Sequence, residues 1–589
     1  MTLDGLLASF DVKERKGFTF SQIVTSFRGL DETENANPNL HFEWVAFMLQ
    51  PNNHERKWGY YYGPHFSGVD ESGVEKDVPS LSDITPDAIA YWEKRYKEAS
   101  NPLLVMRYAG LVWEFKRNIV HQGFEKGLYE TVIESMLTVC NYDYCRHPVE
   151  TVIVLERLFS IARSNVNDLV RVKATYESFE ARHAKDSSVL MWASRFQMML
   201  TYKNAFSDKE IESIVTEHEA RLNRISTPNE KGLVDDPWLV EKQATLLANY
   251  YLSRQQKDEI RRVLRISEDA FIKAFPMMNP LQREGNIETV YHKYLFYGLY
   301  DEAARLSSLI QQLGVEAKES MAPQKFEFSI PKEVFDQIEL CFGEGVSSDE
   351  ERWSNFARFY IPNRSNAVLG LKELVKQYPL VYLMSTKLFD PKGRPMSHIG
   401  SYELDPEGQL VLHIAKSMNL GSFSLNAAIQ TLIHVGCFTS EKFIDDVIKP
   451  SPLFEDNRQE IIKKAIDFYL AGDYLNSCHL LVPQIENAIR NLVEISGGAV
   501  IKQQRQTSHG FQLKTLDELL RQDCVKEVFT EDGAFYFRLV LTDQRALNLR
   551  NLLCHGILPP ESFGVGAADR LIHVLVLLGL VRFIENRTN

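Results

Sequence analysis

The sequence contains few cysteines, and they form no pattern typical of a disulfide framework or a zinc site. Its seven cysteines are scattered singly between Cys140 and Cys554, without any Cys-x-x-Cys pair. An odd and dispersed set is typical of a protein from a reducing compartment. Cys145 and His147 lie too close together, and lack the further ligands, for a zinc site. We therefore expect no structural disulfide, no bound metal and no cofactor.

Long apolar runs are also absent from the sequence. The most apolar stretch, Leu571 to Val581, is well short of the roughly 20 residues that span a bilayer. It contains His573, which we interpret as a core histidine on a buried helix. The first residues lack the basic and apolar segments of a secretory signal. These features predict a cytoplasmic protein that does not contact a membrane.

Familiar nucleotide and metal motifs are missing, since no Walker A loop, no GxGxxG after a strand and no HExxH occurs. The net charge is -13, and a uniformly acidic protein does not attract nucleic acid. Most of the acidic excess lies upstream of residue 451. Contact with nucleic acid therefore requires a local basic surface, for which the candidates are Lys502, Arg505, Arg545 and Arg550.

Helical periodicity dominates the first half of the chain. Asn101-Pro102 supplies a helix N-cap and a first-turn proline, and an apolar stripe follows at Leu104, Tyr108, Leu111 and Phe115. Similar amphipathic helices with short loops continue to residue 322. They predict a helical array over residues 86–322, without a fixed repeat period, that serves scaffolding or recognition.

The segment before the array, residues 1–85, is rich in aromatic side chains, especially in Trp58–Pro64. Aromatic side chains can stack on single-stranded bases. They can equally cover the edge of a hydrophobic core, and this second interpretation is the favoured one.

Residues 323–450 form a predicted helical linker domain that contains a small β-hairpin. Two short strands, Leu380–Phe389 and Met396–Tyr402, flank the turn at Asp390–Gly393. Asp405–Gly408 is interpreted as a second turn, in which Gly408, like Gly393, is a turn residue that tolerates a positive φ.

Residues 451–589 form a predicted bundle of four main helices. The longest runs from Tyr474 to Ile495, carries Pro483 in its interior and ends at Gly497-Gly498. Taken together, the sequence predicts a mainly α fold. It consists of an N-terminal helical array, a small β-hairpin insertion and a C-terminal helical bundle.

Chemistry is concentrated in one segment, Asn548–Gly556. We expect it to be a helix capped by Thr542-Asp543, with Asn548, Asn551 and His555 on one face. Histidine exchanges a proton near neutral pH, and arginine can hold a phosphate at two points. These properties suit metal-independent RNA cleavage, in which His555 moves a proton and Arg550 stabilises the charge on the phosphorane. In the alternative, which the residues alone favour, Arg550 and His555 cap the helix and bond backbone carbonyls.

Two further inferences concern the surroundings of this motif. Glu486, on the long helix, is placed to orient Arg550 or His555, or else to pair with Arg490 at i, i+4. One motif supplies one histidine, so two copies meeting across a dimer would supply both base and acid.

Arg550-Asn551 and His555, followed by Gly556, resemble the signature of the HEPN superfamily (higher eukaryotes and prokaryotes nucleotide-binding domains). The segments Ala471–Tyr474 and His479–Glu486, together with the turn Asp390–Arg394, resemble an uncharacterised, mostly bacterial family within it. That family has a eukaryotic relative linked to the endoplasmic reticulum and RNA degradation. The resemblance covers roughly residues 370–589 and gives the C-terminal bundle a HEPN-like fold.

The resemblance implies a metal-independent endoribonuclease that acts as a homodimer through its C-terminal bundle. Arg550, Asn551 and His555 are its implied catalytic residues, with Asn548 and Glu486 in support. Many such proteins act in phage defence or as toxins, with RNA as substrate, while others have lost activity. The alternative is therefore a non-catalytic scaffold that binds RNA or a protein partner on its array and dimerises through the bundle.

Overall fold

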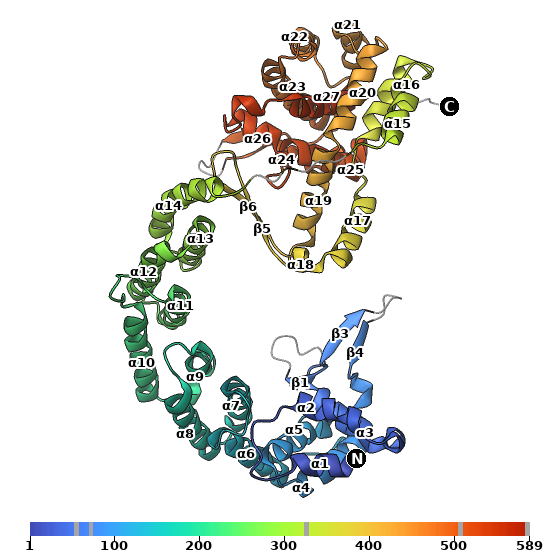
Figure 1. Cartoon of the computed structure of the whole chain (residues 1–589). Helices are drawn as coiled ribbons and strands as arrows, with labels where there is room; N and C mark the ends of the chain where they lie inside the picture. The colour runs from blue at the N-terminus through green and yellow to red at the C-terminus, as the bar shows by residue number, and fades with distance from the viewer. Residues whose placement is uncertain (52–57, 70–74, 323–324, 326–328, 505–509, 584–589) are drawn as a thin grey trace. The chain divides into compact units, whose positions relative to one another are not determined.

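The computed structural model describes the chain except for residues 52–57, 70–74, 323–324, 326–328, 505–509 and 584–589 (Figure 1). Within these described residues the fold is mainly helical and includes four two-stranded antiparallel hairpins, which confirms the predicted fold class. No described helix combines the length and apolar character needed to cross a bilayer. The chain divides into an N-terminal unit, Met1–Met278 with Thr289–Ala303, and a C-terminal unit, Asn279–Glu288 with Ala304–Asn589.

The N-terminal unit begins with three helices and two small hairpins. The helices start at polar caps, of which Thr19 forms a capping box with Gln22, and Asn37 precedes a first-turn proline. The elements are α1 (Leu3–Phe10), α2 (Phe20–Ser26), α3 (Pro38–Met48), β1 (Gln50–Pro51) paired with β2 (Tyr62–Gly63), and β3 (Phe66–Val69) paired with β4 (Glu75–Val78).

The aromatic side chains of Trp58–Pro64 pack against the protein itself. The ring of Tyr60 lies 4.9 Å from that of Phe115, and Tyr62 is buried. The indole Nε1 of Trp58 donates to Asp77 Oδ2 at 3.0 Å. This arrangement confirms the favoured interpretation, in which these rings cover the edge of a core.

The array is built as predicted from consecutive amphipathic helices (Figure 1). The side chains of the predicted stripe on α5, from Leu104 to Phe115, are fully buried. The helices are α4 (Pro86–Glu98), α5 (Pro102–Ile119), α6 (Lys126–Asn141), α7 (Pro148–Ala162), α8 (Val166–His183), α9 (Val189–Thr201), α10 (Asp208–Ser226), α11 (Pro237–Ser253) and α12 (Lys257–Ala274), followed by α13 (Pro280–Phe296) and α14 (Tyr300–Glu319).

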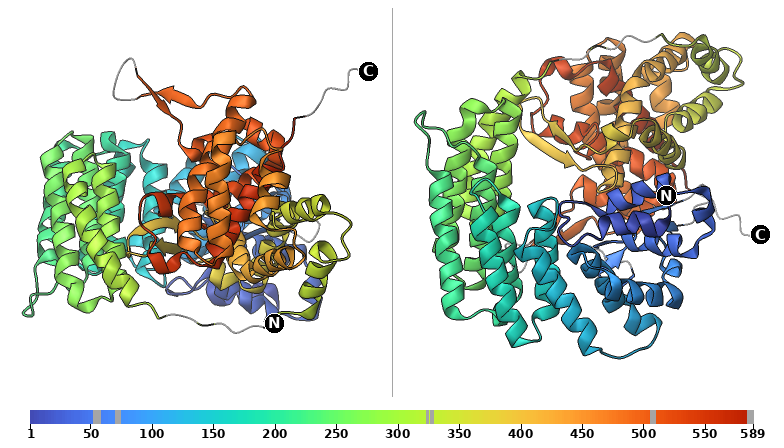
Figure 2. Two further views of the ribbon diagram at one scale, coloured as in Figure 1. Left: turned by 90° about the horizontal axis from the view of Figure 1, so that it is seen from above. Right: turned by 60° about the horizontal axis from the view of Figure 1, so that its bottom comes forward.

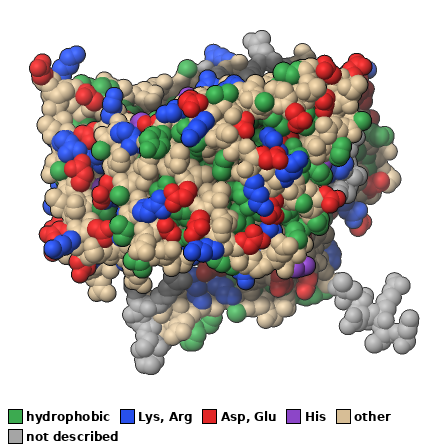
Figure 3. Space-filling view, turned by 90° about the horizontal axis from the view of Figure 1, so that it is seen from below, with side chains coloured by type: hydrophobic (Ala, Val, Ile, Leu, Met, Phe, Trp, Pro, Cys, Tyr) green, Lys and Arg blue, Asp and Glu red, His purple; other side chains and the backbone are tan. Residues whose placement is uncertain are grey.

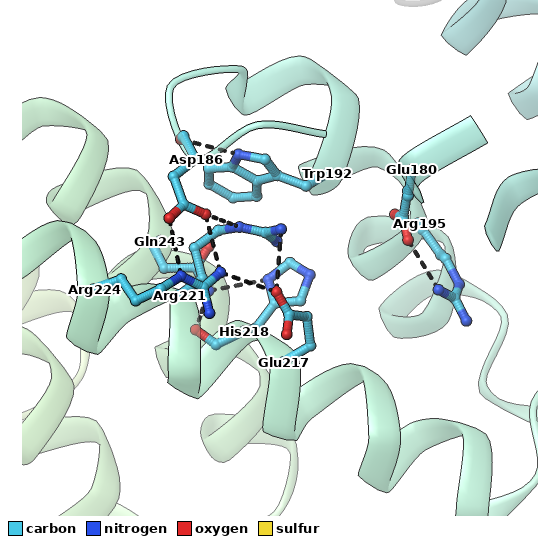
Figure 4. A network of polar contacts seen from close by, with 9 residues as sticks. All are labelled: Glu180, Asp186, Trp192, Arg195, Glu217, His218, Arg221, Arg224 and Gln243. Atoms are coloured by element: carbon cyan, nitrogen blue, oxygen red, sulfur yellow. Dashed lines mark hydrogen bonds and ion pairs between the residues drawn. The ribbon is translucent and has the colours of Figure 1, made fainter. Parts of the chain in front are cut away.

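A buried histidine joins three helices of this array (Figure 4). His218 on α10 is 3% exposed, and its Nδ1 accepts from Gln243 Nε2 of α11 at 3.0 Å. Its ring lies against Phe196 and Trp192 of α9. Burial lowers the pKa of His218 to about 3, so the neutral imidazole is an integral part of the core.

The C-terminal unit has one hydrophobic core, which contains side chains from Ile338 to Leu578. The predicted division near residue 450 falls inside this core, because helices from both sides of it contact α27. The helices are α15 (Lys332–Phe342), α16 (Asp349–Phe359), α17 (Arg364–Gln377), α18 (Pro379–Tyr382), α19 (Pro406–Leu420), α20 (Ser422–His434), α21 (Ser440–Lys442), α22 (Gln459–Leu470), α23 (Tyr474–Ile495), α24 (Leu516–Leu520), α25 (Asp523–Leu541), α26 (Leu549–Cys554) and α27 (Val565–Gly579).

The predicted hairpin exists, but its first strand is shorter than expected. Pro379–Tyr382 forms the short helix α18, and β5 (Thr386–Phe389) pairs with β6 (Pro395–Ile399). Asp390 holds the turn, since its Oδ1 accepts from the backbone amides of Lys392 and Arg394 at 2.8 Å. Gly393 has the expected positive φ of 79°.

The prediction of a second turn at Asp405–Gly408 is wrong. Asp405 is the N-cap of α19, because its Oδ1 accepts from the Gly408 amide at 2.8 Å and Pro406 occupies the first turn. Gly408 is therefore helical and has no positive φ. A polar cap followed by proline starts a helix here, as it does at Asn101-Pro102.

The long helix α23 has the predicted bounds and contains Pro483. It ends in a Schellman motif, in which the Gly498 amide donates to Val493 O and the Gly497 amide to Glu494 O. The next element was not predicted from the sequence. A hairpin of β7 (Ile501–Gln503) and β8 (Phe511–Leu513) projects from the C-terminal unit (Figure 2, left).

Candidate active site

The motif helix α26 is shorter than predicted and begins later. It covers only Leu549–Cys554, because the N-cap is Asn548 in the left-handed conformation, with φ 51°. Thr542 ends α25 and does not cap the motif helix, so this prediction is wrong. In the segment between α25 and α26, the Leu547 amide donates to Leu539 O of α25 at 3.0 Å.

Arg550 is held by two side chains. Its Nε donates to Glu486 Oε2 on α23 at 2.9 Å, and its Nη1 donates to Asn551 Oδ1 at 3.1 Å. Glu486 also contacts Arg490 at 3.4 Å, so both pairings considered from the sequence are present. The shorter contact joins Glu486 to Arg550, and it fixes the guanidinium to the long helix of the bundle.

The two asparagines of the motif lie in one hydrogen-bonded chain with Arg550. Asn551 Nδ2 donates to Asn548 Oδ1 at 2.8 Å and to Thr542 O at 3.3 Å. The side chain of Asn548 is only 2% exposed. Asparagine suits this position because it tolerates the left-handed conformation better than most side chains.

His555 is the C-cap of the motif helix, and its side chain is exposed. Gly556 follows with φ 61°, and the Ile557 amide donates to Leu552 O, which completes a Schellman motif. The imidazole of His555 has no hydrogen-bond partner among the residues that the structure describes. The ring is therefore accessible to a bound molecule.

In the alternative considered from the sequence, Arg550 and His555 bond backbone carbonyls. The observed contacts differ from it. Arg550 contacts a carboxylate and a side-chain amide, and the His555 imidazole contacts neither backbone nor side chain in the described part of the chain. The arrangement keeps one cation fixed and one titratable ring exposed on the same short helix.

Two hollows flank the motif helix. One, of about 360 Å³, lies beside Gly556 and is lined by Leu475, Asn476, His479, Leu553, Gly556, Leu558, Pro560 and Phe563. The other, of about 250 Å³, includes Asn548 and Leu552 together with the hairpin turn at Asp390-Pro391. Two rings line the hollow beside Gly556, and the ring centroids of His479 and Phe563 are 5.0 Å apart.

The described candidates for a basic surface are paired with acidic side chains. Lys502 pairs with Glu518, Arg545 with Asp543 and Arg550 with Glu486. Arg505 lies outside the described residues. On the face drawn in Figure 3, Lys and Arg side chains are likewise interspersed with Asp and Glu.

The remaining histidine considered from the sequence, His573, has a structural role. His573 is fully buried on α27, where its Nδ1 accepts from the Tyr536 hydroxyl at 2.7 Å and its Nε2 donates to Phe356 O at 3.1 Å. It is a core histidine, as predicted. Partial desolvation raises the pKa of the Cys554 thiol, which precedes His555 in the sequence, and this disfavours its use as a nucleophile. In the described ranges, no group of three or more His, Cys, Asp or Glu residues is placed to hold a metal ion.

Asp569, a buried carboxylate on α27, was not among the candidates predicted from the sequence. Its oxygens accept from the Tyr469 hydroxyl at 2.5 Å and from Asn426 Nδ2 at 3.0 Å, and burial raises its pKa. The only signal in the sequence is an Asp-Arg pair, Asp569-Arg570, at the start of an otherwise apolar helix.

Replacing Asn548 with glycine tests whether the hydrogen bond from Asn551 to Asn548 supports Arg550. Glycine adopts the left-handed conformation without strain, so we expect the free energy of unfolding to change by less than about 1 kcal/mol. Asn551 loses its 2.8 Å contact in this variant. We expect Arg550 to become more mobile, which relaxation measurements on its guanidinium NMR signal would show. Unchanged relaxation would contradict a supporting role for Asn548.

Comparisons with protein-family models, with curated proteins and with solved structures find no match for this chain.

Proposed function

We propose that the C-terminal unit is a metal-independent endoribonuclease of the HEPN type. One observation supports this most: Arg550 is fixed by Glu486 and Asn551, while His555 on the same helix has an exposed imidazole without a described partner. This combination supplies a positioned cation and a proton-transfer group. The chemistry that needs both, and needs no metal, is attack of a ribose 2′-OH on the adjacent phosphate.

In this reaction the 2′-oxygen forms a bond to phosphorus while the bond from phosphorus to the 5′-oxygen breaks. The products are a 2′,3′-cyclic phosphate and a 5′-OH. Arg550 stabilises the added negative charge on the phosphorane through guanidinium N–H groups that its two described contacts leave unused. Glu486 and Asn551 keep the guanidinium in place during this step.

Proton transfer needs a base for the 2′-OH and an acid for the leaving oxygen. One chain supplies one His555, so we propose that two chains associate through the C-terminal bundle and contribute one histidine each. The hollow beside Gly556, lined by His479 and Phe563, offers an adjoining surface on which a nucleobase can stack. Roles in phage defence or as a toxin are consistent with this activity.

The activity is tested with purified protein and RNA in the presence of EDTA. We expect cleavage of RNA and none of DNA of the same sequence, because the mechanism requires the 2′-OH. Intact RNA under all conditions, or equal cleavage of DNA, would overturn the proposal.

Replacing Glu486 with alanine should lower kcat by about tenfold and leave KM nearly unchanged, because the change frees Arg550 without removing it. Gln at this position keeps an acceptor and should retain more activity. Glu494 on the same helix is exposed, so Glu494→Ala is the matched control. An equal loss in both alanine variants would show that Glu486 does not position Arg550.

A non-catalytic scaffold is the second candidate function. It is favoured by the pairing of the described basic side chains near the motif and by the net charge of -13. In this case the array binds RNA or a protein partner, and the bundle dimerises. His555→Ala would then leave binding and any cellular phenotype unchanged.

A further inference from the structure

The N-terminal unit contains a cavity of about 310 Å³ that is independent of the motif in the C-terminal unit. It lies between α2, the β1–β2 hairpin, α5 and α7. Its volume is at the lower end of the range of about 300–1,000 Å³ for small-molecule sites. Most of its wall is apolar and includes Phe18, Leu103, Met106, Met136, Ile153 and Val154.

One wall of this cavity carries a buried cation. Arg107 on α5 is 3% exposed, and its Nε donates to Ala46 O at 2.6 Å. Its Nη2 donates to Leu49 O, so both contacts are to carbonyls at the C-terminal end of α3. The rings of Phe20 and Tyr62 lie within 5 Å of its guanidinium carbon.

No carboxylate pairs with Arg107 in the part of the chain that the structure describes. The carbonyls of α3 and the two rings compensate only part of its charge. Burying an ion without a full counter-charge is unfavourable, because the ion loses its hydration. An anion in the cavity would offset this cost.

The other two charged residues of the wall are already bound. Arg157 pairs with Glu114 and lies over the ring of Tyr61, with its guanidinium carbon 4.1 Å from the centroid. The carboxylate of Glu150 accepts from the backbone amide of Arg146 at 3.1 Å, at the start of α7. Arg107 is therefore the cation of this wall that lacks an acidic partner within the described residues.

We propose that this cavity binds a small amphipathic organic anion, with its carboxylate or equivalent group at Arg107 and its aromatic or aliphatic body against the apolar wall. The site is separate from the proposed ribonuclease, and the inference does not depend on it. It gives the N-terminal unit a small-molecule ligand.

The test is a calorimetric titration of the full chain with 2-naphthoate and, separately, with octanoate. The analogues 2-naphthol and 2-naphthylmethylammonium provide the same naphthalene body with a neutral or a positive head. We expect 2-naphthoate to bind at least about tenfold more tightly than either. Equal affinity of the three heads, or no saturable binding of either anion, would overturn the proposal.

Substitutions on α7 and α5, with a control on α8, locate the site. Val154→Phe fills the cavity from α7 and should weaken 2-naphthoate binding by about tenfold or more. Val166→Phe, at an exposed position on α8, is the matched control and should not change it. Arg107→Lys should keep part of the preference for the anion, and Arg107→Met should lose it. If Arg107→Met fails to fold, the head-group series and Val154→Phe still decide, since undiminished binding to Val154→Phe places the ligand elsewhere and overturns the proposal.

Discussion

Replacing His555 or Arg550 with alanine should lower the rate of RNA cleavage by about 100-fold or more, with the fold unchanged. His555 is exposed and its imidazole has no described partner, so its removal leaves no buried group unpaired. Arg550→Ala frees Glu486, which retains its contact with Arg490. Both losses should appear in kcat, because both groups act on the reacting phosphate in the proposed mechanism.

The C-terminal unit offers matched controls for both substitutions. His434 is an exposed histidine in the last turn of α20, and Arg521 is an exposed arginine paired with Asp517. His434→Ala and Arg521→Ala should cleave at the wild-type rate. Loss of activity in these controls as well, or full activity of His555→Ala, would show that the motif does not carry the reaction.

Lowering the pH from 7.5 to 4 should reduce the free energy of unfolding of each unit by about 3 kcal/mol through its buried histidine alone. Burial lowers the pKa of His218 and of His573 from 6.5 to about 3. Below pH 6.5 the unfolded chain binds a proton at each of these sites and the folded chain does not. The contribution of each buried histidine to stability is therefore fully present above about pH 6.5 and is lost progressively as the pH falls toward 3.

Chemical denaturation with 5-fluorotryptophan labels can measure this effect separately in the two units. Trp192 contacts His218 in the N-terminal unit, and Trp353 contacts Phe356, whose ring lies against His573. His573→Gln keeps one donor and one acceptor but does not titrate. It should flatten the pH dependence of the Trp353 transition and leave that of Trp192 unchanged. Equal pH dependence in wild type and variant would contradict the assignment.

The helical architecture could be predicted because local signals agree with the tertiary structure. The stripe on α5 is fully buried, and the long helix α23 has the predicted bounds. Errors arose where one local signal has two meanings. Asp405-Pro406 followed by Gly408 is compatible with a turn, but it is also a cap followed by a first-turn proline, and burial of Leu410 and Val411 selects the helix.

The candidate site was predictable in its residues but not in its geometry. The spacing of Arg550, Asn551 and His555 indicates a shared helix. It does not reveal that Asn548 takes the left-handed conformation or that the helix has only six residues. The contact from Arg550 to Glu486 joins positions 64 residues apart, and no local pattern encodes it. The cavity at Arg107 is formed by elements from distant parts of the N-terminal unit, so no local pattern predicts it.

The chemistry of the new RNA ends tests the central claim most directly. Mass spectrometry of a short RNA incubated in EDTA should find 2′,3′-cyclic phosphate and 5′-OH ends with wild type and neither with His555→Ala. Ends that carry a 3′-OH and a 5′-phosphate, or RNA that stays intact with the wild-type protein, would contradict a ribonuclease built on Arg550 and His555.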